Sequence, residues 1–291
     1  MKRIRKWPIA ATAVLALALA ACSSNTDTHR GAGTSDASRP TISHIHGLGI
    51  DPADNRLYVA THEGIFTPGE GGAAQRVGDS RDDFMGLTVA KAKRFLASGH
   101  PAPGADGPGN RGLIESNDSG KTWKTRSLAG EVDSHSLDYA DGTIYGYDSA
   151  NGLLRVSKDG TTWQDRARLR ALDIAVSPND PDTVLATTAE GVAKSIDGGK
   201  TFAAGKQPVM ALVSWAKPDA LYGIDTSGGL NRSTDAGMTW QKTATVPGGQ
   251  PQALTAVDAQ HVLAATQDGV YESRDGGKTF TKRLAGSNGD H

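Results

Sequence analysis

Five of the eight histidines in this chain lie between residues 44 and 135. Imidazole nitrogens are the commonest protein ligands of transition metals. His44 and His46 lie two positions apart, so on a strand both rings project from the same face. Clustered titratable groups in a cleft mark functional sites, so convergence of the five would predict a binding site. The five histidines are His44, His46, His62, His100 and His135.

Acidic and sulfur-bearing residues flank these histidines in the chain. Asp82, Asp83 and Met85 lie between His62 and His100, and Asp133 directly precedes the segment of His135. A His/Asp set suits zinc or another divalent ion, whereas a His/Met set suits copper. We therefore predict a ligand or metal face that includes Asp83, Asp133 and Met85, with Cu or Zn as the ion. The alternative is separate histidines that each hydrogen-bond at a loop end.

A repeated phrase indicates how these residues are positioned. Its first copy reads SerAsnAspSerGlyLysThrTrp (116–123), and its last reads SerArgAspGlyGlyLysThrPhe (273–280). Ser and Asp favour turns, Gly adopts positive φ, and the final aromatic residue buries apolar surface. A period of about 40 residues is that of a four-stranded propeller blade. The aspartates of the five copies, which we expect to be structural, are Asp118, Asp159, Asp197, Asp235 and Asp275.

One further unit, residues 42–78, precedes these copies and lacks the phrase. Its predicted strands are 46–50 and 57–61, and a Gly-rich segment at 67–72 replaces the repeated turn. We expect an all-β fold, a six-bladed β-propeller of four-stranded antiparallel blades, as a single domain over residues 41–286. Apolar contacts between the first and last blades should close the ring.

Propeller geometry predicts which face carries the site. In antiparallel blades the innermost strand starts where the second strand ends, and the repeated turns lie on the other face. His62 and His100 end second strands, so they should lie on the face where the innermost strands start. Alignment of those starts predicts a ring around the channel mouth: His46, Met85, His135, Leu172, Met210 and Gln252.

The repeated phrase resembles the BNR or Asp-box repeat of sialidases, sortilin-type receptors and other propellers. In that family the boxes are structural and lie away from the ligand site. Three other stretches resemble bacterial lipoproteins named "glycosylhydrolase": HisIleHisGlyLeuGly (44–49), AlaSerGlyHisPro (97–101) and TyrGlyTyrAspSer (145–149). We favour a binding module that holds a ligand or metal ion at the histidine-lined channel mouth.

The resemblance leaves a glycoside hydrolase of the exo-sialidase type as the alternative. A sialidase requires an arginine cluster, a Tyr/Glu nucleophile pair and an acidic residue. The sequence lacks the ArgIlePro phrase of that family and shows no three-arginine arrangement. Candidate catalytic residues for acting on surface or extracellular glycans are Asp148, Tyr145 and Glu63.

The N-terminus predicts export and lipidation. Basic residues at 2–6 precede an apolar stretch at 7–21, which is too short for a membrane span. The stretch ends in LeuAlaAlaCys, which looks like a bacterial lipobox with lipidation at Cys22. We expect a signal peptide at 1–21, a flexible tether at 22–40 and a tail at 287–291. This places the protein on the extracytoplasmic side of a bacterial cell membrane.

Composition limits the partners. The chain has 31 basic and 32 acidic residues, and beyond the basic run at 2–6 the charges are not clustered, which argues against nucleic acid as a partner. Cys22 is the single cysteine, so no intramolecular disulfide forms. We expect a monomer that binds the membrane through its lipid and takes a glycan, metal or protein ligand. The Pro/Gly-rich insertion at 101–112 is either a lid or docking loop over the histidines, or a tolerated surface insertion.

Overall fold

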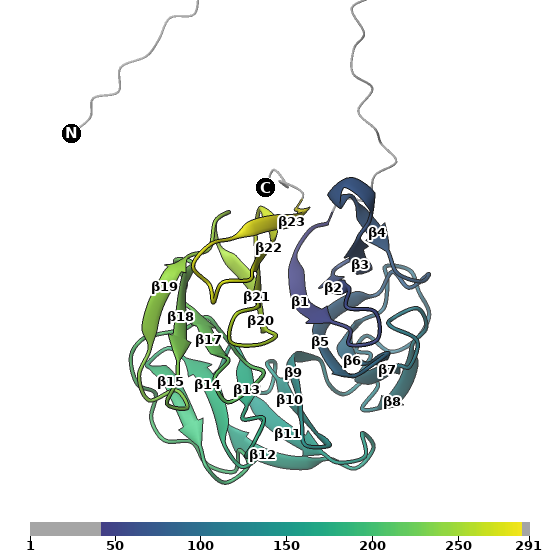
Figure 1. Ribbon diagram of the computed structural model, residues 1–291. Helices are drawn as coiled ribbons and strands as arrows, with labels where there is room; N and C mark the ends of the chain where they lie inside the picture. Colours follow the sequence, from purple (N-terminus) through teal and green to yellow (C-terminus); the bar gives the residue numbers. More distant parts are fainter. Residues whose placement is uncertain (1–41, 287–291) are drawn as a thin grey trace, which may run out of the picture. The chain divides into compact units, whose positions relative to one another are not determined.

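The computed structural model describes residues 42–286 as six antiparallel sheets arranged in a ring (Figure 1). The predicted six-bladed β-propeller is therefore confirmed. Within 42–286 no helix has the length and apolar character of a membrane span. The expected signal peptide, tether, lipidation site Cys22 and C-terminal tail lie outside the described residues.

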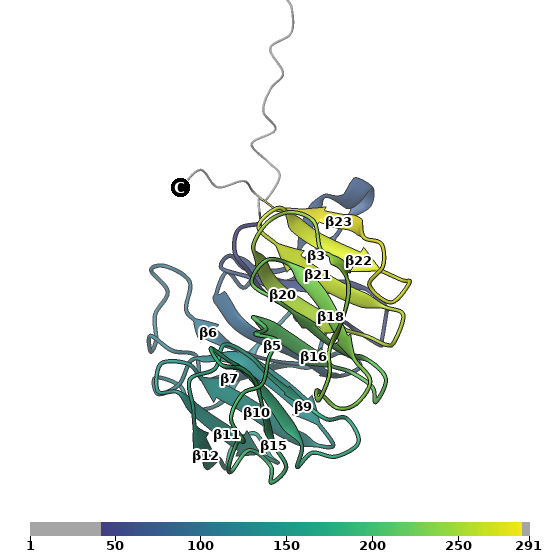
Figure 2. The same cartoon turned by 90° about the vertical axis from the view of Figure 1, so that its left-hand side faces the viewer.

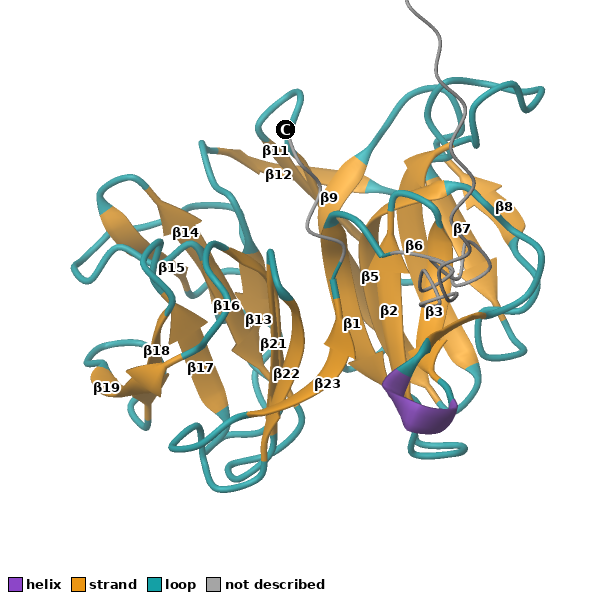
Figure 3. Cartoon of the chain, turned by 90° about the horizontal axis from the view of Figure 1, so that it is seen from above, coloured by secondary structure: helices purple, strands orange, loops and turns teal. Residues whose placement is uncertain are grey.

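Each blade is built from strands that follow one another in the chain, with the innermost strand first. The only helix in the described part is the short 3-10 turn η1 (Glu70–Gly72), drawn in purple in Figure 3. Blade one comprises β1 (Ile45–Ile50), β2 (Leu57–Thr61), β3 (Gly64–Pro68) and β4 (Ala74–Arg76). Blade two comprises β5 (Asp83–Lys91), β6 (Arg94–His100), β7 (Leu113–Ser116) and β8 (Lys124–Ser127). Blade three comprises β9 (Ser134–Ala140), β10 (Thr143–Asp148), β11 (Leu153–Ser157) and β12 (Gln164–Arg168). Blade four comprises β13 (Ile174–Val176), β14 (Val184–Thr188) and β15 (Gly191–Ser195). Blade five comprises β16 (Leu212–Trp215), β17 (Leu221–Ile224), β18 (Gly229–Ser233) and β19 (Gln241–Thr245). Blade six comprises β20 (Pro251–Ala256), β21 (Val262–Thr266), β22 (Gly269–Ser273) and β23 (Thr281–Ala285).

Blade four differs from the expected pattern at its outer edge. Its sheet contains three strands, and the segment predicted as its fourth strand joins the sheet through one bridge between Val192 and Lys206. Gly205 and Pro208 interrupt this segment, because glycine weakens a strand and proline cannot donate to its ladder. The outer segment thus contacts β15 through this bridge and a bond from Ala203 N to the Lys194 carbonyl (2.9 Å), without forming a regular strand.

One hydrophobic cluster fills each seam between neighbouring blades. The seam between blades one and six contains Ile45 and Val59 from one side and Leu263 and Leu284 from the other. In Figure 2 the yellow strands of blade six lie beside blade one, which confirms that apolar contacts close the ring. The aromatic residues of the repeated turns are half-buried against these clusters: Trp123, Trp163, Phe202, Trp240 and Phe280.

The repeated turns share a hydrogen-bond pattern. In the last copy the Ser273 hydroxyl donates to Asp275 Oδ1 (2.7 Å) and accepts from Gly277 N (2.8 Å). The Thr279 hydroxyl donates to Asp275 Oδ2 (2.6 Å), and these bonds hold the pKa of Asp275 below its usual range. Corresponding serine–aspartate bonds occur at Asp118, Asp159, Asp197 and Asp235.

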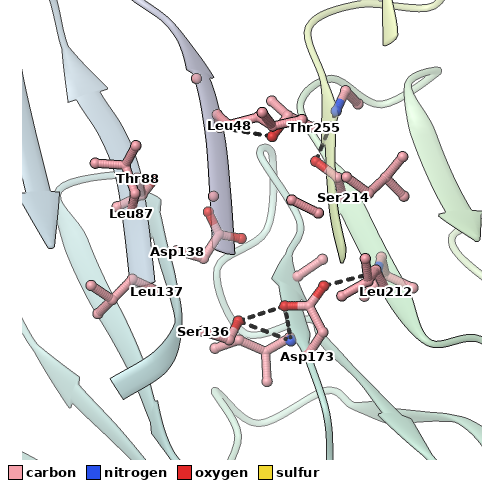
Figure 4. Close-up of a pocket in the computed structure, with 18 of the residues that line it drawn as sticks. Leu48, Leu87, Thr88, Ser136, Leu137, Asp138, Asp173, Leu212, Ser214 and Thr255 are labelled. Carbon is pink, nitrogen blue, oxygen red and sulfur yellow. Dashed lines mark hydrogen bonds between the residues drawn. The ribbon is translucent and has the colours of Figure 1, made fainter. Parts of the chain in front are cut away.

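The innermost strands enclose a channel with a volume of about 830 Å³. Hydrogen bonds from side chains in the channel wall connect neighbouring blades (Figure 4). Asp173 of blade four accepts from the Ser136 hydroxyl (2.6 Å) and from Val213 N (2.9 Å), so it links three blades. Asp138 accepts from Val176 N (2.7 Å), and burial raises the pKa of both carboxyls to about 6.

Candidate functional site

The predicted histidines come from blades one to three and from the ends of strands that the blade topology brings to the same side. His46 and His135 both line the central channel. His62 directly follows β2, and His100 is the last residue of β6, where it pairs with Asp83 at the start of β5. Antiparallel pairing thus places second-strand ends beside first-strand starts, as the sequence predicted. We refer to the five histidines with Asp83 and Asp133 as the histidine cluster.

Three imidazole rings of blade one form a parallel stack. The His62 ring lies between the other two, with centroid distances of 4.7 Å to His44 and 4.6 Å to His46. The interplanar angles are 8° and 14°. Burial first, and then the neighbouring histidines, lower the pKa of His46 to about 4. His46 is therefore neutral at pH 7, and its Nε2 atom is buried without a hydrogen-bond partner among residues 42–286.

Ligand atoms of His46, His62 and Asp83 lie within 4.8 Å of one another. The distance from His62 Nε2 to Asp83 Oδ1 is 3.9 Å, and this oxygen is buried with no hydrogen-bond partner in the described part. Burial raises the pKa of the Asp83 carboxyl. A Cβ at Gly99, where φ is +152°, would lie 1.9 Å from the Asp83 carbonyl oxygen, so glycine is required for this close approach.

The other half of the cluster is centred on Asp133. Its Oδ2 atom accepts from His135 Nε2 (2.6 Å) and lies 3.1 Å from His100 Nε2. The Asp133 side chain is 8% exposed. This hydrogen bond is the main cause of a raised pKa at His135. The two halves are adjacent, because His100, which lies beside Asp133, pairs with Asp83 in the ladder between β5 and β6.

The insertion at 101–112 is anchored beside the cluster. Asp82 pairs with Arg111 (NH2 to Oδ1, 2.7 Å) and accepts from Ala102 N (2.9 Å). His100 Nδ1 lies 3.0 Å from the Gly109 carbonyl oxygen. Asp82, which the sequence offered as a metal ligand, instead holds both ends of this loop.

Two methionines of the predicted mouth have different surroundings. Met85 is half-buried and lines the channel wall with His46 and His135. Met210 is completely buried in the seam between blades four and five, so its predicted place at the mouth is wrong. It precedes β16, and its side chain fills the seam rather than the channel. Gln252 accepts from Ile45 N (3.1 Å) across the closing seam.

The three candidate catalytic residues of a glycosidase are not brought together. Burial raises the pKa of Tyr145 to about 12, and its hydroxyl donates to the Pro181 carbonyl in an inter-strand turn of blade four (2.8 Å). Asp148 is 1% exposed and pairs with Arg155 (3.0 Å). Glu63 accepts from the Ser43 hydroxyl. Each of these groups thus has a separate set of partners.

Sequence reasoning missed two carboxylates and one carbonyl. Asp138 and Asp173 line the channel, and each interrupts an apolar run with a charge, which is the signal that marks them. No sequence signal marks the Gly109 carbonyl as a partner of His100, because the contact depends on the path of the insertion.

A scan against protein-family models and a search of curated proteins gave no match. Among solved structures, the chain is similar to a gluconolactonase from Xanthomonas campestris, with a TM-score of 0.61 and 15% identity over 78% of this chain and 84% of that one. It is similar to YCF48 bound to a D1 peptide, with a TM-score of 0.53 and 16% identity over 84% and 83%.

A third similar structure is an ancestral GH74 enzyme, with a TM-score of 0.54 and 16% identity. The match covers 84% of this chain but 39% of the GH74 chain, so this protein spans about two fifths of that enzyme. At these identities the three likenesses show the shared propeller fold and nothing finer. Both enzymes and a peptide-bound propeller share this architecture.

Proposed function

We propose that this propeller is a binding module that holds a divalent transition-metal ion at the channel mouth, through His46, His62 and Asp83. The observation that carries the proposal is the convergence of their ligand atoms within 4.8 Å, with His46 Nε2 and Asp83 Oδ1 buried and unpaired among the described residues. Buried polar atoms normally find a partner, and an ion would supply one to both.

The donor set favours Zn²⁺ or Cu²⁺. Two imidazole nitrogens and one carboxylate oxygen match the three protein ligands of a site with one open position. For bonds of about 2.0–2.1 Å, ligand atoms on a tetrahedral ion lie about 3.3 Å apart, so small side-chain rotations would close the site. Cu²⁺ should bind more tightly than Zn²⁺, following the general order for such ligands.

We also propose a cellular setting. The lipobox-like sequence at Cys22 supports a lipid anchor on the extracytoplasmic side of a bacterial membrane. The shared serine–aspartate bonds of the five repeated turns support a place among the Asp-box propellers.

Metal titration of the purified full-length protein tests the proposal. Isothermal titration with Zn²⁺ and Cu²⁺ should show saturable binding, and His62→Ala should weaken it at least 10-fold. His261→Ala is the matched control, because His261 lies beside Glu272 (2.7 Å) in blade six and should leave affinity unchanged. Absence of saturable binding, or equal affinity in His62→Ala and the natural protein, would refute the assignment.

A further inference from the structure

Asp133 is a buried carboxylate with unused coordination capacity. Its side chain is 8% exposed, and Oδ1 is buried without a hydrogen-bond partner in the part of the chain that the structure describes. Its other oxygen, Oδ2, faces the Nε2 atoms of both His135 and His100. An oxygen of a carboxylate that is more than nine-tenths buried normally has a partner, so the unpaired Oδ1 favours a cation or a further hydrogen-bond donor at this position.

His100 is oriented as a metal ligand. Its Nδ1 atom lies 3.0 Å from the Gly109 carbonyl oxygen, which can only accept, so Nδ1 carries the hydrogen. In the neutral ring Nε2 then presents a lone pair to Asp133 Oδ2 at 3.1 Å. Two lone pairs face each other at this distance only if a proton or a metal ion lies between them. Donation of the second ring N–H to a backbone carbonyl is typical of metal-bound histidines.

The geometry points to a second divalent ion, held by His100 Nε2 and the Asp133 carboxylate, with Asp83 between the two metal positions. The separation of 3.1 Å from His100 Nε2 to Asp133 Oδ2 is close to the roughly 3.3 Å expected for two ligands of one tetrahedral ion. His135, at 2.6 Å from the same oxygen, is too close to share that geometry and acts as the donor that orients Asp133. This inference rests on the proposed function of the first position.

The carboxylates of the cluster and the solvent exposure of its histidines are compatible with two bound ions. Asp83 and Asp133 supply two carboxylates, which offset part of the charge of two divalent cations. The side chains of His100 and His135 are 40% and 38% exposed, so an ion can reach the second position from solvent. The anchored insertion fixes Gly109, and through it the ring of His100. The same loop that borders the mouth therefore orients one metal ligand.

Stoichiometry separates the two positions. Full-length protein, desalted after incubation with excess Zn²⁺, should contain two equivalents by elemental analysis. His100→Ala and Asp133→Asn should each retain one equivalent, held at the first position. Gly109→Ala is the control: its Cβ would contact nothing within 4 Å and its carbonyl is kept, so two equivalents should remain.

A spectroscopic measurement keeps the inference testable if a variant misfolds. With two equivalents of Cu²⁺, a pair of neighbouring ions should lose EPR intensity through coupling, whereas one equivalent should not. One equivalent in the natural protein, unchanged in His100→Ala, would overturn the second position and leave the first intact. No bound metal at all would overturn the proposed function itself.

Discussion

His46 and His135 show how the fold gives the same side chain two different acidities. Burial and the stacked rings of His62 and His44 disfavour a charge on His46, so its pKa falls to about 4. The hydrogen bond from His135 to Asp133 favours a charge on His135, so its pKa rises. One ring thus offers a lone pair, while the other donates a hydrogen bond to a carboxylate.

We predict that NMR titration of the metal-free protein separates these two imidazoles. His46 should remain neutral down to about pH 5, whereas His135 should titrate above the ordinary value of about 6.5. The two pKa shifts make the folding stability depend on pH in opposite directions. His46 contributes stability that is lost as pH falls below 6.5 toward 4, and His135 contributes stability that is lost as pH rises through its folded-state pKa. Identical midpoints for the two rings would contradict the stacked arrangement.

At the scale of the element, each repeated turn depends on a buried serine more than on its aspartate, which has greater contact with solvent. Ser273 is 1% exposed, and its hydroxyl accepts from the buried Gly277 amide while it donates to Asp275. The aspartate makes more hydrogen bonds but remains in water, where each bond contributes less to stability.

We predict that Ser273→Ala destabilises the domain by about 1–3 kcal/mol, because it leaves the Gly277 amide buried and unpaired. Urea unfolding followed by circular dichroism measures the change. Ser227→Ala, which removes an exposed hydroxyl from a different turn, should change stability by less than about 0.5 kcal/mol. Equal effects of the two substitutions would show that burial of the serine is not what matters.

The elements were predictable because their signals are local. The repeated phrase fixed the period and therefore the number of blades and the direction of their strands, which placed His62 and His100 at strand ends. The reduced edge of blade four was missed, since Gly205 and Pro208 act within a segment that follows an intact turn. Side-chain contacts across the seams were harder to predict from the sequence. Nothing in the sequence distinguishes Met210, which fills a seam, from Met85, which lines the channel.

The same limit applies to the histidine cluster. Strand alternation brings five histidines to one side of the blades, but the order of the ring stack depends on rotamers and on the positive φ of His44 (41°). The pairing of Asp82 with Arg111 depends on how a long insertion folds back. Sequence thus predicted which residues could meet, and packing determined which atoms face one another.

At the scale of the whole molecule, the ring is closed by a seam that resembles its other five. Leu263 is completely buried in this closing seam, and Leu185 is completely buried between blades four and five. Within residues 42–286 no strand is exchanged between the first and last blades, so side-chain packing has to hold them together, with the Thr255 hydroxyl donating to the Leu48 carbonyl (2.8 Å).

We predict that Leu263→Ala costs about 2–5 kcal/mol, the range for a buried leucine truncated to alanine. Leu185→Ala is the matched substitution at an ordinary seam and should cost about the same. Denaturant unfolding of both variants provides the comparison. A cost near zero for Leu263→Ala alone would mean that the ring opens at this seam in solution.

Every sheet is formed by one uninterrupted stretch of chain. A chain that began at any of the other five sheets could therefore form the same ring. Ile42 and Leu284 belong to a single cluster, so the domain's own beginning and finish are neighbours. A circularly permuted chain, cut between β8 and β9 and rejoined through a short linker across those neighbours, should preserve the wedge order and keep the imidazoles of blades one and two in place.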